Sequence, residues 1–254
     1  MALVKSRAIS LKAYRLGETS KVVVCYTRDY GKVRLVAKGA RKGGGRLGAA
    51  LEPMQVSGVV FYLRHGRDLS FVSQAEVERQ WPELRRDVVR MAYAGAALEL
   101  TDAMVSDREP DPALFDILET VLARTASAAP PLLDVALWSF ELSLASELGY
   151  SPELARCVVC AGPLEGRVSF GARRGGIVCS NCVGEEPDAS LMSEAGASIL
   201  AALPDVADED IPIAVRDEIG EVLRGFLEEH AGRELKLKSL DFLAQVRRTG
   251  RYPV

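Results

Sequence analysis

Four cysteines have the residue type and the spacing of a metal site. Cys157 and Cys160 form one C-x-x-C pair, Cys179 and Cys182 form a second, and eighteen residues separate the two pairs. This spacing is typical of a tetrahedral zinc site, because each pair can bend into a knuckle that holds both sulfurs about 2.3 Å from the ion. Four thiolates close the coordination shell, so we predict one Zn²⁺ ion with a structural role. Iron, which four thiolates also suit, is the alternative.

The chain between the two cysteine pairs favours a hairpin. Arg167–Phe170 and Gly176–Val178 are short runs that flank a glycine-rich turn. A knuckle, a hairpin and a second knuckle together predict a zinc-ribbon-like module. Arg173 and Arg174 at the hairpin tip are either solvated or in contact with phosphate.

Groups suited to catalysis do not occur at a recognisable spacing. His65 and His230 are the only histidines, and neither has an obvious nucleophile as a partner. The phosphate-binding pattern GxxxxGK[ST] is missing, because Lys42 is followed by Gly43. A zinc enzyme acting on nucleic acid would need an open metal position and a general base. We therefore predict that the protein is not an enzyme and has no small-molecule substrate.

The charge of the chain is segregated. Twelve lysines and arginines stand against Glu18 and Asp29 in residues 1–48, a charge of +10, so the total of −3 leaves −13 for the remainder. This asymmetry predicts a polyanion-binding head on an acidic body. A solvated basic face without a partner is the alternative, but twelve cations would then repel one another without a ligand.

Nothing in the sequence indicates a membrane or an export route. No stretch approaches the roughly 18 uncharged apolar residues that a membrane span needs. No apolar segment follows Lys5 and Arg7 in the manner of a signal peptide. The cysteine usage fits a reducing compartment. We expect a cytoplasmic protein that does not contact a membrane.

The basic head is predicted to be β-structure. Five segments rich in Val, Phe and Tyr are strand candidates: Val4–Leu16, Lys21–Thr27, Lys32–Lys38, Met54–Leu63 and Leu69–Glu76. Turn residues separate them, most clearly in the hairpin that ends at Gly31. Five short strands with one long glycine-rich connection predict an OB-fold barrel, with an SH3-like barrel as the competitor.

Side chains alternate along the third of these strands. Val33, Leu35 and Ala37 are expected in the barrel core, and the opposite face is expected in solvent as a row of cations. That row is Lys32, Arg34 and Lys38, with Val36 among them. A cationic loop too glycine-rich to pack follows from Gly39 to Arg46. Tyr30, in a turn, is the preferred residue for stacking on a base. Phe61, Phe71 and Cys25 are expected in the barrel core.

Helical periodicity replaces the strand pattern after Trp81. The predicted helices are Pro82–Val105, Ala113–Thr125, Leu132–Leu148, Ser190–Leu203, Ile213–His230 and Ser239–Arg248. We therefore predict an α+β multidomain protein. Its domains are an OB-fold domain at 1–80, a helical domain in two parts at 81–155 and 187–254, and a four-cysteine zinc-binding module at 156–186 that is inserted between those parts.

Several segments resemble the RecO family of bacterial DNA repair and recombination mediators. They are Tyr26–Lys32, Val36–Lys42 with its A-K-G-A-R run, Arg46–Pro53, Ser73–Glu76 and Leu237–Leu243. The likeness covers the whole chain, with the four cysteines between the helices.

The resemblance implies an N-terminal OB-fold, a helical body and a zinc-binding insertion. It further implies binding to single- and double-stranded DNA and annealing of complementary strands. Its expected partners are RecR, the single-stranded-DNA-binding protein and, indirectly, RecA, in the cytoplasm at the nucleoid. From charge and position we predict the DNA contacts Lys21, Tyr30, Lys32, Arg34, Lys38, Arg41, Lys42 and Arg46. An RNA-binding or ribosome-associated protein is the alternative, because OB-folds and zinc ribbons serve there too.

Overall fold

The computed structural model describes residues 2–41, 45–63, 68–164, 166–203, 205–206 and 210–249. The chain forms two compact units, Met1–Ser127 with Leu237–Val254, and Ala128–Lys236. The boundaries of these units differ from the predicted domain ranges. Segments from both ends of the predicted helical domain, up to Ser127 and from Leu237, group with the barrel. No helix in the described ranges is long and apolar enough to cross a membrane.

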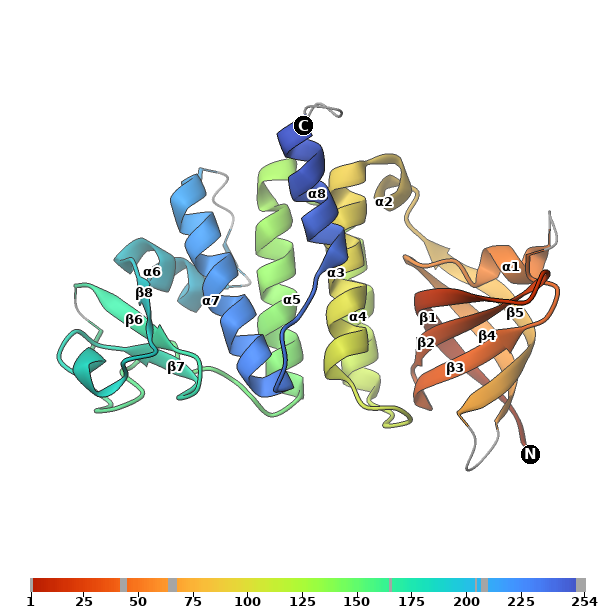
Figure 1. Cartoon of the computed structure of the whole chain (residues 1–254), viewed down its shortest axis with the longest axis horizontal. Helices are drawn as coiled ribbons and strands as arrows, with labels where there is room; N and C mark the ends of the chain where they lie inside the picture. The colour runs from red at the N-terminus through yellow and green to blue at the C-terminus, as the bar shows by residue number, and fades with distance from the viewer. Residues whose placement is uncertain are drawn as a thin grey trace. The chain divides into compact units, whose positions relative to one another are not determined.

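The first unit begins with a closed five-stranded barrel (Figure 1). Its strands are β1 (Ala2–Leu16), β2 (Ser20–Thr27), β3 (Gly31–Ala37), β4 (Gln55–Leu63) and β5 (Leu69–Gln80). Strand β1 is antiparallel to both β2 and β4, β5 lies antiparallel to β4, and β3 runs parallel to β5. This closure in the order β1-β2-β3-β5-β4 is the predicted OB-fold topology, and the SH3-like alternative falls away.

The glycine-rich connection between β3 and β4 packs more closely than predicted. It contains a short helix, α1 (Arg46–Ala50), whose Gly48 and Ala50 are buried. A Cβ atom on Gly48 would lie 2.2 Å from the carbonyl oxygen of Ala40, so only glycine fits this approach. The loop expected from Gly39 to Arg46 therefore ends one residue earlier, because Arg46 begins α1, and Ala40 within it packs against Gly48.

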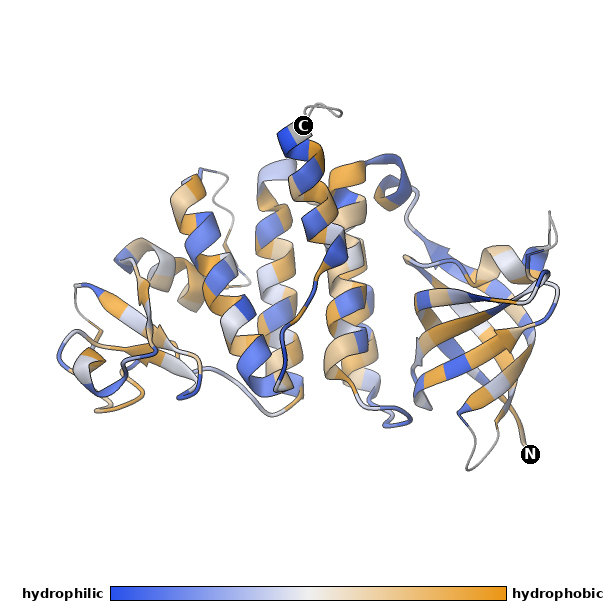
Figure 2. Cartoon of the chain, in the orientation of Figure 1, coloured by the Kyte–Doolittle hydropathy of each residue, from blue (hydrophilic) through white to orange (hydrophobic). Residues whose placement is uncertain are grey.

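Alternation along the strands produces the barrel core, and Figure 2 shows hydrophobic and hydrophilic residues alternating on the ribbon. The buried members are Ala8, Val23, Cys25, Val33, Leu35, Ala37, Leu51, Val59, Phe61 and Val72. Phe61 and Cys25 are core residues as predicted, and burial raises the pKa of the Cys25 thiol to about 12. Phe71 is not in the core, because its neighbour Val72 takes the inward position.

Helices α2 (Glu83–Arg86), α3 (Val88–Met104), α4 (Pro112–Ser127) and α8 (Lys238–Thr249) complete the first unit. The single helix predicted over 82–105 is wrong, because Asp87 has extended dihedral angles and its side chain accepts the N–H groups of Val89 and Arg90. Asp87 thus caps α3, as Asp commonly does at this position. Helix α8 packs on α3, where Ser239 donates to Glu99.

The second unit contains η1 (Pro130–Leu132), α5 (Leu133–Glu147), β6 (Val168–Gly171), β7 (Gly176–Val178), η2 (Val183–Glu185), β8 (Ser190–Met192), α6 (Glu194–Ala202) and α7 (Ile213–Ala231). The predicted hairpin is present as β6 and β7. The helix predicted from Ser190 is wrong at its start, because Ser190–Met192 pairs with β6 as a third strand. Ser193 then caps α6 by accepting the N–H of Gly196.

One carboxyl group lies inside the second unit. Glu141 on α5 is 5% exposed, and burial raises its pKa to about 8, although Arg224 on α7 opposes the rise. The native state therefore keeps a proton that the unfolded chain loses near pH 4.5. Because the folded pKa is the higher one, the stability of this unit falls as the pH rises from about 4.5 to about 8.

Glu141→Gln should remove this pH dependence, since an amide has no proton to lose. We expect the variant to gain thermal stability over the parent chain at pH 8, and to gain much less at pH 5. The measurement is the unfolding temperature at both pH values, with the exposed Glu147→Gln on the same helix as the control. Parallel pH profiles for the parent chain and Glu141→Gln would contradict the assignment.

Candidate nucleic-acid interface and metal centre

The four predicted metal ligands lie together. The sulfurs of Cys157, Cys160, Cys179 and Cys182 are all within 4.8 Å of one another, and the Cys160 and Cys179 sulfurs are 3.8 Å apart. Thiolates about 2.3 Å from a tetrahedral centre lie about 3.8 Å from each other, so this donor set fits one ion. Three of the cysteines are buried and Cys160 is exposed.

The backbone supports negative charge on these sulfurs. Burial of the Cys157 thiol raises its pKa, but backbone N–H groups, first that of Cys179, outweigh burial and lower the pKa to about 6. The Cys182 thiol donates to the sulfurs of Cys160 and Cys179, which raises its own pKa to about 12. Four sulfurs this close cannot all ionise without a cation. The cluster therefore has the chemistry of a divalent metal site, and its metal would stabilise the fold rather than react.

The outward face of β3 is covered at Lys32 and Val36, which corrects part of the expected solvent-exposed cation row, whereas Lys38 is exposed. Lys32 is 8% exposed and donates to the backbone oxygen of Asp102 at 2.8 Å, with the Asp107 carboxylate 3.7 Å away. Burial lowers the pKa of Lys32, and the two aspartates oppose this shift. Arg34 pairs with the same Asp107 carboxylate, and Val36 is buried. These residues hold β3 against the end of α3 and the segment after it.

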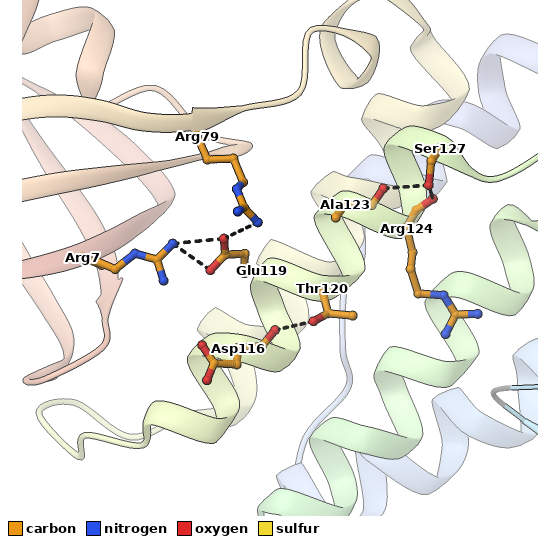
Figure 3. Close-up of a pocket in the computed structure, with 8 residues that line it drawn as sticks. All are labelled: Arg7, Arg79, Asp116, Glu119, Thr120, Ala123, Arg124 and Ser127. Atoms are coloured by element: carbon orange, nitrogen blue, oxygen red, sulfur yellow. Dashed lines mark hydrogen bonds and ion pairs between the residues drawn. The ribbon is translucent and has the colours of Figure 1, made fainter.

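Further cations of the barrel pair with the first helices. Lys12 pairs with Asp102 and Arg28 with Asp116. Figure 3 shows Arg7 and Arg79 converging on Glu119 of α4, at 2.9 and 3.0 Å. These three side chains line a hollow of about 480 Å³ in the first unit.

Lys21 also has an internal role. Its amine donates to the Gly48 backbone oxygen at 3.2 Å and pairs with Glu52 at 2.8 Å, so it fastens α1 to β2. Six of the twelve cations in residues 1–48 are thus bound to carboxylates: Arg7, Lys12, Lys21, Arg28, Lys32 and Arg34. Sequence analysis missed this pairing because most of these partners are 70 or more residues away along the chain.

Other predicted contacts remain accessible. Lys38, Arg41 and Arg46 are exposed, and Arg41 also donates to the backbone oxygens of Gly17 and Glu18. Lys42 lies outside the residues that the structure describes. Lys5 and Arg15 are exposed as well, although they were not among the predicted DNA contacts.

Tyr30 is poorly placed for stacking on a base. Its half-buried ring packs edge-on against Phe61 in the barrel core, with ring centroids 5.6 Å apart. The turn position that favoured Tyr30 in the sequence directs it inward. The exposed aromatic residues of the barrel are Tyr14 and Tyr62.

The two arginines at the tip of the β6–β7 hairpin form ion pairs with acidic residues. Arg173 lies 3.5 Å from Glu229, and Arg174 pairs with Glu186. These pairs favour the solvated alternative over a phosphate contact for the two arginines.

The structure thus combines a closed OB-fold barrel, a helical body and a four-cysteine cluster that could hold a metal ion. Family comparison identifies which proteins share this combination. Residues 1–81 match the N-terminal model of recombination protein O, and residues 85–241 match its C-terminal model. The chain belongs to the RecO family.

Relatives named DNA repair protein RecO share about a third of their residues with this chain. The protein of Bacillus pumilus is 32% identical, over 96% of this chain and 94% of its own length. Those of Pelotomaculum thermopropionicum and Anaeromyxobacter dehalogenans are 35% and 36% identical, with at least 92% of each chain covered. Membership of this family gives the protein a role in DNA repair.

Metal removal should expose four thiols at once. We expect one Zn²⁺ per chain by elemental analysis, and four reactive thiols after chelation under native conditions. The fifth, Cys25, should react only on unfolding, because its thiol is buried with a pKa of about 12. Cys179→Ser should lose the metal and lower the unfolding temperature, whereas Cys25→Ala should retain the metal. Full metal content in Cys179→Ser would contradict the ligand assignment.

Proposed function

We propose that this protein is a DNA-binding recombination mediator without catalytic activity. It binds single- and double-stranded DNA, anneals complementary strands and, with RecR, promotes loading of RecA onto strands held by the single-stranded-DNA-binding protein. We place this activity in the cytoplasm, at the nucleoid. Zn²⁺ in the four-cysteine cluster stabilises the second unit and takes no part in binding chemistry.

The observation that carries the proposal is the division of the barrel's positive charge. Of the twelve cations in residues 1–48, six are held by carboxylates and five are exposed without a described carboxylate partner. These five are Lys5, Arg15, Lys38, Arg41 and Arg46, and Lys42 lies outside the described residues. Exposed cations displace counterions from phosphate, which gives binding that tolerates any sequence and weakens with salt.

Of the predicted DNA contacts, we retain Lys38, Arg41, Lys42 and Arg46. Lys21, Lys32 and Arg34 support the fold instead, because moving them to phosphate would leave Glu52, Asp102 and Asp107 without their partners. The side chains of Lys21 and Lys32 are themselves only 11% and 9% exposed, so neither amine reaches a phosphate without breaking the contacts that bury it.

The same charges account for annealing. Two strands that approach one cationic surface repel each other less, because part of their phosphate charge is neutralised on it. The surface needs no sequence preference, since the strands recognise one another by base pairing.

Removing the exposed cations should lower the affinity for DNA and make that affinity less dependent on salt. We expect Lys38→Gln, Arg41→Gln and Arg46→Gln together to reduce the slope of log affinity against log salt by about 2 on single-stranded DNA, at about 0.7 per phosphate contact. Fluorescence anisotropy across a salt series measures this slope. The control removes three cations of the second unit, Arg156→Gln, Arg233→Gln and Lys236→Gln. Equal slopes for the two triple variants would overturn the proposed surface.

A pair of lysine variants separates binding from folding. We expect Lys38→Met to lower DNA affinity and leave the unfolding temperature unchanged, because its amine is exposed. Lys32→Met should lower the unfolding temperature and leave the salt slope unchanged, because its amine is bound to Asp102 and Asp107. Calorimetry and anisotropy on the same preparations test both. A normal unfolding temperature with a reduced slope for Lys32→Met would restore it as a DNA contact.

A further inference from the structure

An apolar row crosses the outside of the barrel from strand to strand. The pairing register aligns Tyr14 with Val22, Val22 with Val36, Val36 with Phe71, Phe71 with Tyr62, and Tyr62 with Leu3. Residues aligned in this way share a face of the sheet. We name these six residues the outer row: Leu3, Tyr62, Phe71, Val36, Val22 and Tyr14.

The outer row faces away from the barrel core. Tyr62 is next in sequence to the core residue Phe61, Phe71 to Val72, Val36 to Leu35 and Val22 to Val23. Leu3, Tyr14 and Tyr62 are 58%, 52% and 36% exposed, Phe71 and Val22 are half-buried, and Val36 is buried at 3% exposure. The row therefore presents three aromatic rings on strands that a soluble domain usually covers with polar side chains.

Cations lie over two of the three rings. The Lys38 amine is 4.9 Å from the centre of the Phe71 ring, and the Lys12 amine is 5.6 Å from the centre of the Tyr14 ring. Lys5 and Arg15, both exposed, lie on β1 two residues from Leu3 and one residue from Tyr14. The row thus combines aromatic faces with positive charge.

We propose that the outer row is a stacking platform for the unpaired bases of single-stranded DNA, with Tyr14, Tyr62 and Phe71 as the stacking residues. This inference rests on the proposed DNA-binding function and adds to it the base-contacting residues. Aromatic rings beside cations suit a single strand, because the rings take the base faces and the cations take the phosphates. A protein partner would favour an apolar patch without lysines placed over its rings.

The rings of the row are spaced for more than one nucleotide of the same DNA strand. Tyr62 and Phe71 are on neighbouring strands about 4.8 Å apart, and Tyr14 is three strands further round the barrel. Each ring therefore serves a different base along one strand. A duplex offers no base faces except at its ends, so the platform adds affinity for single strands alone and leaves duplex binding to the cations.

The test compares an oligothymidylate with a strand of the same length whose bases are replaced by abasic sites. The parent chain should bind oligothymidylate more tightly. We expect Tyr14→Ala and Tyr62→Ala each to lower the affinity for oligothymidylate at least about fivefold. Binding to the abasic strand and to duplex should be unchanged. The salt slope should also be unchanged, because no phosphate contact is removed.

Matched variants control for the ring and for the fold. Tyr14→Phe retains the ring and should bind as the parent does, and Tyr150→Ala removes an exposed tyrosine of the second unit. Unfolding temperatures check that both alanine variants are folded. Tyr14→Trp adds a direct readout, since a stacked base quenches its fluorescence.

The outcomes that would overturn these proposals are distinguishable. If the parent chain binds neither strand at low salt, the proposed function itself falls. If it binds both strands equally and the alanine variants bind as the parent does, DNA binding stands and the stacking platform is overturned. A row variant with normal DNA affinity that has lost a protein partner would assign the row to that partner instead.

Discussion

The pairing of barrel cations with carboxylates of the first helices is the interaction on which the first unit depends. Lys32 and Arg34 on β3 contact Asp102 and Asp107, and Arg7 on β1 contacts Glu119. Six of the twelve cations in residues 1–48 are engaged in such ion pairs within the first unit. The acidic residues of this region are structural counterions, and a polyanion can reach only the barrel surface that they leave uncovered.

Sequence reasoning succeeded where a local pattern carries the information. Alternating apolar residues placed all five strands to within a few residues, and the C-x-x-C spacing identified four sulfurs that lie within 4.8 Å of one another. It failed where the deciding partner is distant in sequence. The alternation along β3 correctly places Lys32 and Val33 on opposite faces of the strand, but it cannot show that Asp102 covers the outward face at Lys32.

The same limit applies to capping and to aromatic residues. Asp87 and Ser193 each stand where one element ends and a helix begins, and each caps that helix with its side chain. Hydrophobic periodicity does not detect such a boundary, so the predicted helices extended across both residues. Tyr30 was favoured because turns are exposed, yet its ring turns onto Phe61. That Tyr14 and Tyr62 share the outer face of the barrel follows only from the register of strand pairing, which the sequence does not encode locally.

The covered face constrains the path of a bound strand. A DNA strand crossing β3 near Lys32 would find the cations of that face already paired with Asp102 and Asp107. Beyond the end of β3, Lys38 is exposed and lies over the Phe71 ring. The proposed DNA path therefore follows exposed cations such as Lys38 and avoids the face of β3 whose cations are held by carboxylates.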